Sequence, residues 1–211
     1  MIVTIDTGKN NIGSFIKSVH KIGYNTKVSL DKKIVQRADA IILPGVGAFG
    51  EIMSILSKNS LVEVIRKKVL EEKTPILGIC LGMQLLSSES EEHGIHKGLN
   101  LIPGRVVKLK SSNKNVRVPN IGWCDVYPVR ETILIPNIDE IKSYYHVHSY
   151  HFQCQNEKDS VATIPFDGKN ISVLVQNGNI FGTQFHPEKS QDAGLDLLEN
   201  FFQYLKQNNI N

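Results

Sequence analysis

The sequence predicts an α/β fold in which helices cover a mostly parallel sheet. In its first half, short apolar runs alternate with segments of helical periodicity, and this order is typical of parallel strands joined by helices. In its second half, shorter apolar runs between turn residues predict antiparallel strands added to that sheet. The chain has 211 residues, enough for a sizeable core, and no Pro/Gly/Ser-rich linker divides it. We therefore expect a single domain over residues 1–211.

The first half is expected to supply the parallel strands and the helices between them. Strands are expected at residues 2–5, 26–30, 40–43 and 75–77. One helix is indicated by the spacing of Ile12, Phe15, Ile16 and Val19, and a long amphipathic helix is expected over residues 52–71. Ligands bind at the carboxyl ends of strands in such sheets, so the segments after residues 43 and 77 are candidate sites.

The second half is expected to add antiparallel strands and a closing helix. Strands are expected near residues 101–109, 133–135 and 171–175, with a turn at residues 177–179. Four apolar residues share one face of the closing helix, and Ser190 is its expected N-cap. These four are Leu195, Leu198, Phe202 and Leu205.

Composition excludes several classes of protein. Hydrophobic residues make up 41% and charged residues 21%, which suits a soluble globular protein. The net charge of +3 is too small to imply nucleic-acid binding. No apolar run is long enough for a membrane span, and no signal peptide is evident. Three sparse cysteines fit reduced thiols, so we expect a cytoplasmic protein.

The segment from Gly78 to Gln84 (GICLGMQ) is the strongest indication of chemistry. Gly-x-Cys-x-Gly after a short apolar run is the thiol form of a nucleophile elbow, and a helix-like segment is expected from Leu85. Such a turn holds the sulfur clear of the sheet at a helix N-terminus, which favours thiolate over thiol. Cys80 is therefore the candidate nucleophile.

Residues 182–188 (GTQFHPE) supply its partners. A nucleophilic thiol needs a base that takes its proton and returns it to the leaving group, and the base needs a carboxylate to orient it. His186 and Glu188 fit these roles, and with Cys80 they complete a candidate triad.

Three segments resemble the class I (triad) glutamine amidotransferases: residues 44–49 (PGVGAF), 78–84 and 185–190 (FHPEKS). Within that family the chain is most similar to the glutaminase subunits of imidazole glycerol phosphate synthase, of histidine biosynthesis. Residues 118–123 (VPNIGW), 148–150 (HSY) and 185–191 with Gly194 and Leu195 carry this closer resemblance. It implies a flavodoxin-like sheet with helices on both faces.

The resemblance also implies a reaction and its site. Cys80 would attack the side-chain amide of L-glutamine, His186 would protonate the departing ammonia and then activate water, and Glu188 would orient His186. No cofactor and no metal are implied. Further roles are implied for two sets of residues: an oxyanion hole at Gly45, Val46, Gly47 and Leu81, and glutamine binding at Gln84, His148, Ser149 and Tyr150.

A partner is implied as well, because members of this subfamily pass ammonia to a separate cyclase. That subunit is a (β/α)8 barrel, and the two form a heterodimer. Residues expected at the contact are Asn10, Asn11, Trp123 and Lys189. A core position for the single Trp123 is the alternative.

The sequence departs from the subfamily pattern in three places. Residues 7–11 read TGKNN where a Tyr-Gly-x-Gly-Asn type of segment is usual, Asn120 replaces a usual His, and Cys124 replaces a usual Asn. These departures leave open a paralogue that feeds ammonia to an amidating enzyme of bacterial surface-sugar biosynthesis. A noncatalytic binding subunit and a related triad hydrolase are further alternatives.

Residues 144–151 contain three histidines, His146, His148 and His151. The first two would share one strand face, which makes a zinc site conceivable. No carboxylate or cysteine lies nearby at ligand spacing, so a strand beside the substrate is the favoured interpretation.

Overall fold

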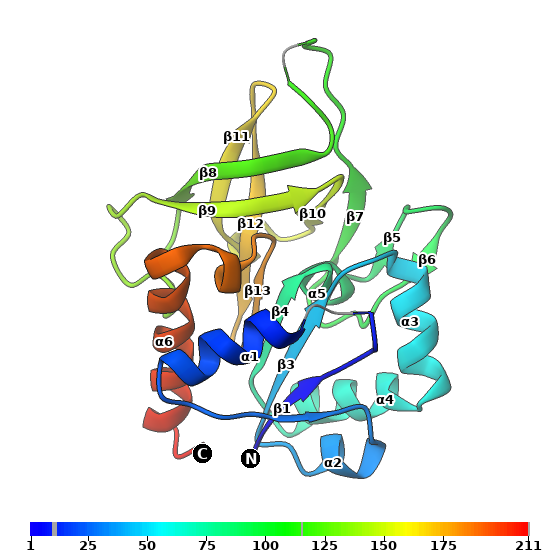
Figure 1. Cartoon of the computed structure of the whole chain (residues 1–211). Coiled ribbons are helices and arrows are strands. Elements are labelled where there is room, and N and C mark those ends of the chain that lie inside the picture. Colours follow the sequence, from blue (N-terminus) through cyan, green and yellow to red (C-terminus); the bar gives the residue numbers. More distant parts are fainter. Residues whose placement is uncertain (10–11, 115, 211) are drawn as a thin grey trace.

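The computed structural model describes residues 1–9, 12–114 and 116–210 (Figure 1). Among these residues a nine-stranded sheet has the order β2-β1-β3-β4-β13-β12-β11-β8-β9. The first five strands in this order pair in parallel. They are β2 (Lys27–Ser29), β1 (Ile2–Ile5), β3 (Ala40–Gly45), β4 (Ile76–Cys80) and β13 (Ile180–Thr183).

The remaining strands of this sheet are antiparallel. They are β12 (Lys169–Asn177), β11 (Ser160–Phe166), β8 (Asn120–Pro128) and β9 (Lys142–His148). The expected turn joins β12 to β13, where Asn177 pairs with Ile180. The α/β fold with parallel strands and added antiparallel strands is therefore confirmed.

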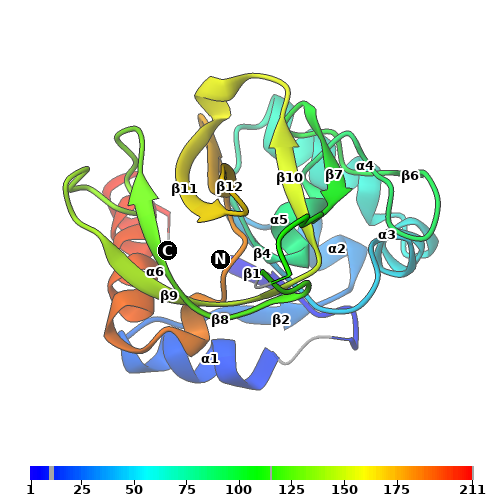
Figure 2. The same ribbon diagram turned by 90° about the horizontal axis from the view of Figure 1, so that it is seen from above.

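A second sheet of four strands, in the order β10-β7-β5-β6, stands beside the first. Its strands are β10 (Tyr150–Cys154), β7 (Gly104–Lys108), β5 (Glu89–Ser90) and β6 (His96–Lys97). Only Ser149 separates β9 from β10, so the chain passes directly from one sheet to the other (Figure 2).

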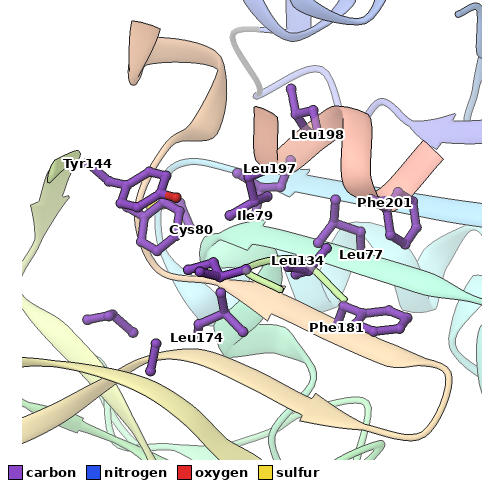
Figure 3. Packing of buried hydrophobic residues seen from close by; sticks show 14 of the residues in the cluster. Leu77, Ile79, Cys80, Leu134, Tyr144, Leu174, Phe181, Leu197, Leu198 and Phe201 are labelled. Carbon is purple, nitrogen blue, oxygen red and sulfur yellow. The ribbon is translucent and has the colours of Figure 1, made fainter. Parts of the chain in front are cut away.

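Helices cover both faces of the main sheet because its strands are apolar on both sides. One buried cluster joins the sheet to α1 (Ile12–Lys21) and α6 (Gln191–Gln207). Figure 3 shows part of it, with Leu197 and Phe201 of α6 near Leu77 of β4. The opposite cluster includes residues of α2 (Lys32–Gln36), α3 (Phe49–Lys58), α4 (Leu61–Arg66) and α5 (Leu81–Leu85).

The single long helix expected over residues 52–71 is wrong. The chain forms α3, then α4, then a π-helical turn over Lys67–Glu71. Asn59 donates its side-chain amide to the carbonyl of Ile55 at 2.8 Å, and Ser60 has a left-handed φ of 53°. Asn and Ser side chains compete with helical hydrogen bonds, which explains a break that apolar periodicity does not show.

The strand expected at residues 133–135 is also wrong, because only an isolated bridge joins Thr132 to Ile135. Leu134 and Ile135 are buried, and the Leu134 carbonyl accepts a hydrogen bond from Asn200 of α6. A short apolar run that packs as a loop has the same pattern as a strand. In the described residues, no helix combines the length and apolar character that crossing a membrane requires.

Phe201→Ala is expected to destabilise the fold without touching the candidate site. The ring is fully buried and makes edge contacts with Phe181 and Phe202. Truncating a buried Phe costs about 3–5 kcal/mol, which lowers Tm by roughly 6–20 °C in a chain of this size. Thermal melts measure this, with the exposed Gln203→Ala as the control. A Tm within about 2 °C of the wild type would contradict the packing described.

Candidate active site

Cys80 lies at the junction of β4 and α5 in a strained backbone conformation. Its φ is 56° and its ψ is −112°, a region that non-glycine residues seldom adopt and that often marks functional sites. A Cβ on Gly82 would lie 1.7 Å from the carbonyl oxygen of Leu43, so only glycine lets α5 approach β3. The helix begins at Leu81, directly after the cysteine, so the expected start at Leu85 is wrong.

His186 and Glu188 form a buried pair at the end of the sheet. The Nδ1 of His186 lies 2.7 Å from Oε1 of Glu188, and their side chains are 3% and 7% exposed. A carboxylate on Nδ1 fixes the ring's orientation and leaves Nε2 for chemistry. Among the described residues, neither this Nε2 nor the Glu188 Oε2 has a hydrogen-bond partner.

Ser190 holds the loop that carries this pair. Its hydroxyl donates to the His186 carbonyl at 2.6 Å and accepts from the Tyr145 N–H at 3.0 Å. The His186 N–H donates to the Tyr145 carbonyl, also at 3.0 Å. Ser190 does precede α6, but its side chain makes no cap bond. The predicted N-cap position is confirmed, and the Ser190 carbonyl accepts from the Gly194 N–H at 3.1 Å, whereas the hydroxyl ties the loop to β9.

The electrostatics of the site favour a protonated His186. Burial by itself lowers the pKa of this imidazole, but its interactions with Cys80 and Glu188 outweigh burial and raise the pKa to about 10. A protonated imidazole beside a sulfur stabilises the thiolate, which is the nucleophilic form of cysteine. The arrangement can therefore support nucleophilic attack followed by proton transfer.

The residues expected in the oxyanion hole lie around the elbow. Gly45 pairs with Cys80 across β3 and β4, and a Cβ on Gly45 would lie 2.7 Å from the backbone N of Gly82. Val46 and Gly47 follow in the loop before α3, and Gly47 has a φ of 101°. Leu81 begins α5 directly after the nucleophile.

The four residues expected to bind glutamine meet on one wall beside the elbow. The Gln84 side-chain amide donates to the Tyr150 carbonyl at 3.1 Å, and the His148 Nδ1 lies 2.9 Å from the same oxygen. Ser149 lies between His148 and Tyr150 in the chain. Its carbonyl accepts a hydrogen bond from the Leu109 N–H at 2.8 Å.

Gln184 also belongs to this wall, although the sequence analysis assigned it no role. Its Oε1 accepts from Gln84 at 2.9 Å and its Nε2 lies 3.8 Å from the Cys80 sulfur. The side chain is fully buried. A polar residue two positions before His186, on the same face of an apolar segment, was the signal that could have revealed it.

The residues expected to contact the partner differ in how far the structure describes them. Trp123 is 49% exposed, so it is not a core residue, and it packs edge-on against Tyr145. Lys189 is exposed, with its ammonium 6.0 Å from the centre of the Tyr145 ring. Asn10 and Asn11 lie outside the described residues.

The histidines of β9 face inward, and burial keeps them neutral. Burial lowers the pKa of His146 to about 3 and that of His148 to about 4. Their nearest ring nitrogens are 3.4 Å apart. Within the described ranges, no set of three His, Cys, Asp or Glu side chains is placed to hold a metal ion.

A cleft of about 1200 Å³ lies elsewhere, between β7 and β10 on one side and β11 and β12 on the other. None of the candidate triad residues lines it. The candidate triad therefore lies outside this cleft.

Comparisons with known proteins identify the family of this chain. The family described as "Glutamine amidotransferase class-I" matches residues 3–205. The imidazole glycerol phosphate synthase subunit HisH 2 of Methanococcus maripaludis is 42% identical, over 95% of this chain and 98% of its own. The subunit HisH of Sulfurimonas denitrificans is 44% identical, over 97% and 98%.

Solved structures show the same fold at lower sequence similarity. A glutamine amidotransferase crystal structure gives a TM-score of 0.74 at 18% identity, covering 98% of both chains. The PurLQS structure from Thermotoga maritima gives 0.72 at 17% identity, covering 97% of this chain and 98% of that one. With a family match over nearly its whole length and relatives above 40% identity, the chain belongs to the class I glutamine amidotransferases.

Proposed function

We propose that this protein is the glutaminase subunit of an imidazole glycerol phosphate synthase, supplying ammonia for histidine biosynthesis in the cytoplasm. The observation that carries the proposal is the similarity to subunits of that synthase along nearly the whole chain. A buried His186–Glu188 pair that interacts with Cys80 supports the hydrolytic half of the function.

The proposed reaction has two halves. The Cys80 thiolate adds to the side-chain amide carbon of glutamine, the C–N bond breaks, and protonated His186 gives its proton to the leaving ammonia. A γ-glutamyl thioester remains. Neutral His186 then takes a proton from water, the hydroxide attacks the thioester carbon, and glutamate leaves with the thiolate restored. Glu188 holds the imidazole in position throughout.

Charge that develops on the amide oxygen needs aimed backbone donors. We place them at the N–H of Leu81 and in the loop from Gly45 to Gly47, which lies against the elbow. The left-handed φ of Gly47 supports this, because glycine lets the neighbouring peptide plane reorient at low cost.

Gln84 and the residues that surround its side chain are proposed to recognise the substrate. Both N–H groups of its amide are donated, one to Tyr150 and one to Gln184. This fixes the amide's orientation and leaves its Oε1 to accept from the α-ammonium of glutamine. Backbone groups at His148, Ser149 and Tyr150 complete the binding of the α-substituents.

The outer face of β8 and β9 is the proposed surface for the cyclase, which we expect to be a (β/α)8 barrel. Ile121 and Trp123 of β8 and Val147 of β9 are 61%, 49% and 36% exposed. An exposed apolar group of this kind on a sheet marks an interaction site. Tyr145 and Lys189 border it.

We infer that the chain works as one domain, because both sheets share a core. Phe152 of β10 and Val106 of β7 belong to the same buried cluster as Leu85 and Leu86, next to the elbow. The glutamine wall also takes its residues from both sheets.

The decisive experiment reconstitutes the protein with the histidine-pathway cyclase and measures glutamine hydrolysis with and without the cyclase's nucleotide substrate. Stimulated hydrolysis with imidazole glycerol phosphate formed from glutamine is the expected result. One observation favours a surface-sugar paralogue instead: Asn120 and Cys124 stand where the subfamily usually has His and Asn. That alternative predicts no binding and no stimulation, with Cys80 still reactive toward a glutamine-like electrophile.

Cys80→Ser is expected to lower glutamine hydrolysis by about a thousandfold or more, because the hydroxyl is a far weaker nucleophile than the thiolate. Steady-state ammonia release in the reconstituted complex measures this. Cys154→Ser is the matched control: Cys154 is also a free thiol, and burial raises its pKa to about 12. Unchanged ammonia release by Cys80→Ser would overturn the assignment of the nucleophile.

Trp123→Ala is expected to weaken cyclase binding by about thirtyfold, since a central exposed Trp is a typical interface anchor. Titration calorimetry measures the Kd. Val129→Ala serves as control, because Val129 has the same exposed fraction, 49%, and lies just beyond the end of β8. Equal Kd values for the two variants would mean that the cyclase binds a different surface of this protein.

A further inference from the structure

The inward face of the β8–β9 ribbon carries polar groups that the proposed mechanism does not use. Asn120 pairs with His148 across the two strands, and Cys124 pairs with Tyr144. The Asn120 side-chain amide lies 3.2 Å from the His148 Nε2 and 3.7 Å from the Cys124 sulfur. His146 and His148 are 0% and 6% exposed.

The hydrogen bonds of His148 define its tautomer. A backbone carbonyl only accepts, so the contact with Tyr150 at 2.9 Å requires a proton on the His148 Nδ1. In the neutral ring the Nε2 is then an acceptor, and the Asn120 amide N–H donates to it. The His146 Nδ1 lies 3.4 Å from the same Nε2, a longer contact than that of Asn120. The His146 Nε2 is one of the buried side-chain atoms that lack a partner in the described residues.

These contacts continue to the nucleophile. The Tyr150 carbonyl accepts from both His148 and Gln84, Gln84 donates to Gln184, and Gln184 reaches the Cys80 sulfur. A buried polar network whose members are satisfied holds a unique arrangement, and a change at one member is felt by the others.

We propose that Asn120 is a positioning residue for glutamine: it holds His148 as the neutral Nδ1–H tautomer, and through the shared Tyr150 carbonyl it fixes the amide of Gln84. The inference rests on the proposed glutaminase function and extends it. Asn120 and the outward-facing Trp123 lie on opposite faces of β8.

Asn120→Asp tests this with almost no change in shape. A carboxylate beside the His148 Nε2 replaces a donor with an acceptor and raises the pKa of His148, since an opposite charge favours the imidazolium. The other groups that face His148 are His146 on β9, His151 on β10 and His186 before η3 (Pro187–Lys189), and none is a carboxylate. The new positive charge at His148 faces the protonated His186.

The expected result is a rise of about tenfold in KM for glutamine at pH 7, with a smaller change in kcat, as for the loss of one well-placed hydrogen bond. As the pH is raised through the new pKa of His148, activity should fall further, because the neutral ring then donates from its Nε2 to the carboxylate and its Nδ1 no longer donates to the Tyr150 carbonyl. Nitrogen-15 NMR of the imidazoles should show His148 neutral in the wild type and protonated in Asn120→Asp. A merely structural defect would not follow the titration of His148.

Two further variants keep the test decisive. Asn137→Asp adds the same charge at an exposed loop position, where an oxygen can still accept from the Asp139 N–H, and it should match the wild type. Asn120→Leu removes the donor without adding charge, and it should raise KM to a similar extent at every pH. Thermal melts and alkylation of Cys80 by iodoacetamide report folding and thiol reactivity in every variant.

The proposal is overturned if Asn120→Asp shows the KM and pH profile of Asn137→Asp, or if its activity is low at every pH while His148 stays neutral. A wild-type complex that hydrolyses no glutamine would instead overturn the proposed function. The tautomer seen by NMR would then still decide the structural part of the inference.

Discussion

The active site depends on one close approach between two backbones. Gly82 lies against the carbonyl of Leu43 with no room for a side chain, and this contact lets α5 start directly at the end of β4. Cys80 consequently keeps a left-handed φ, which projects its sulfur beyond the sheet. The strain at this residue costs of order 1–3 kcal/mol, and the fully buried strands β3 and β13 on either side of β4 stabilise it.

The rest of the site comes to the elbow from elements that are distant in the sequence. His186 is held by Ser190 and by the backbone of Tyr145, so β9 fixes the base as well as the substrate wall. Within the wall, Gln84 of α5 donates to Gln184, the residue that follows β13. In the proposed mechanism, substrate binding and proton transfer therefore depend on the same strand, β9.

The sequence was informative where local pattern and chemistry agree. Local physical reasons explain three features: the apolar runs of the parallel strands, the Gly-x-Cys-x-Gly turn and the His-Pro-Glu segment. The predictions from sequence were wrong where tertiary contacts decide the structure. Asn59 and Ser60 interrupt a helix that periodicity extends, and Leu134 is buried without joining a strand. The Ser190 hydroxyl bonds to β9, and only its backbone carbonyl bonds to the helix it precedes. The pairing of Gln84 with Gln184 spans a hundred residues, and no local pattern reveals it.

Alternate residues along the strands of the β8–β9 ribbon face two different surroundings. Outward residues such as Trp123 meet solvent, whereas inward residues such as Asn120 and His148 meet the glutamine wall. Substitutions can therefore retune either surface without disturbing the other. An insertion or deletion of one residue cannot, because it would turn every following side chain to the opposite side. Sequence drift in this ribbon should consequently proceed by replacement at constant length, and length variation should be confined to the loop over residues 129–141.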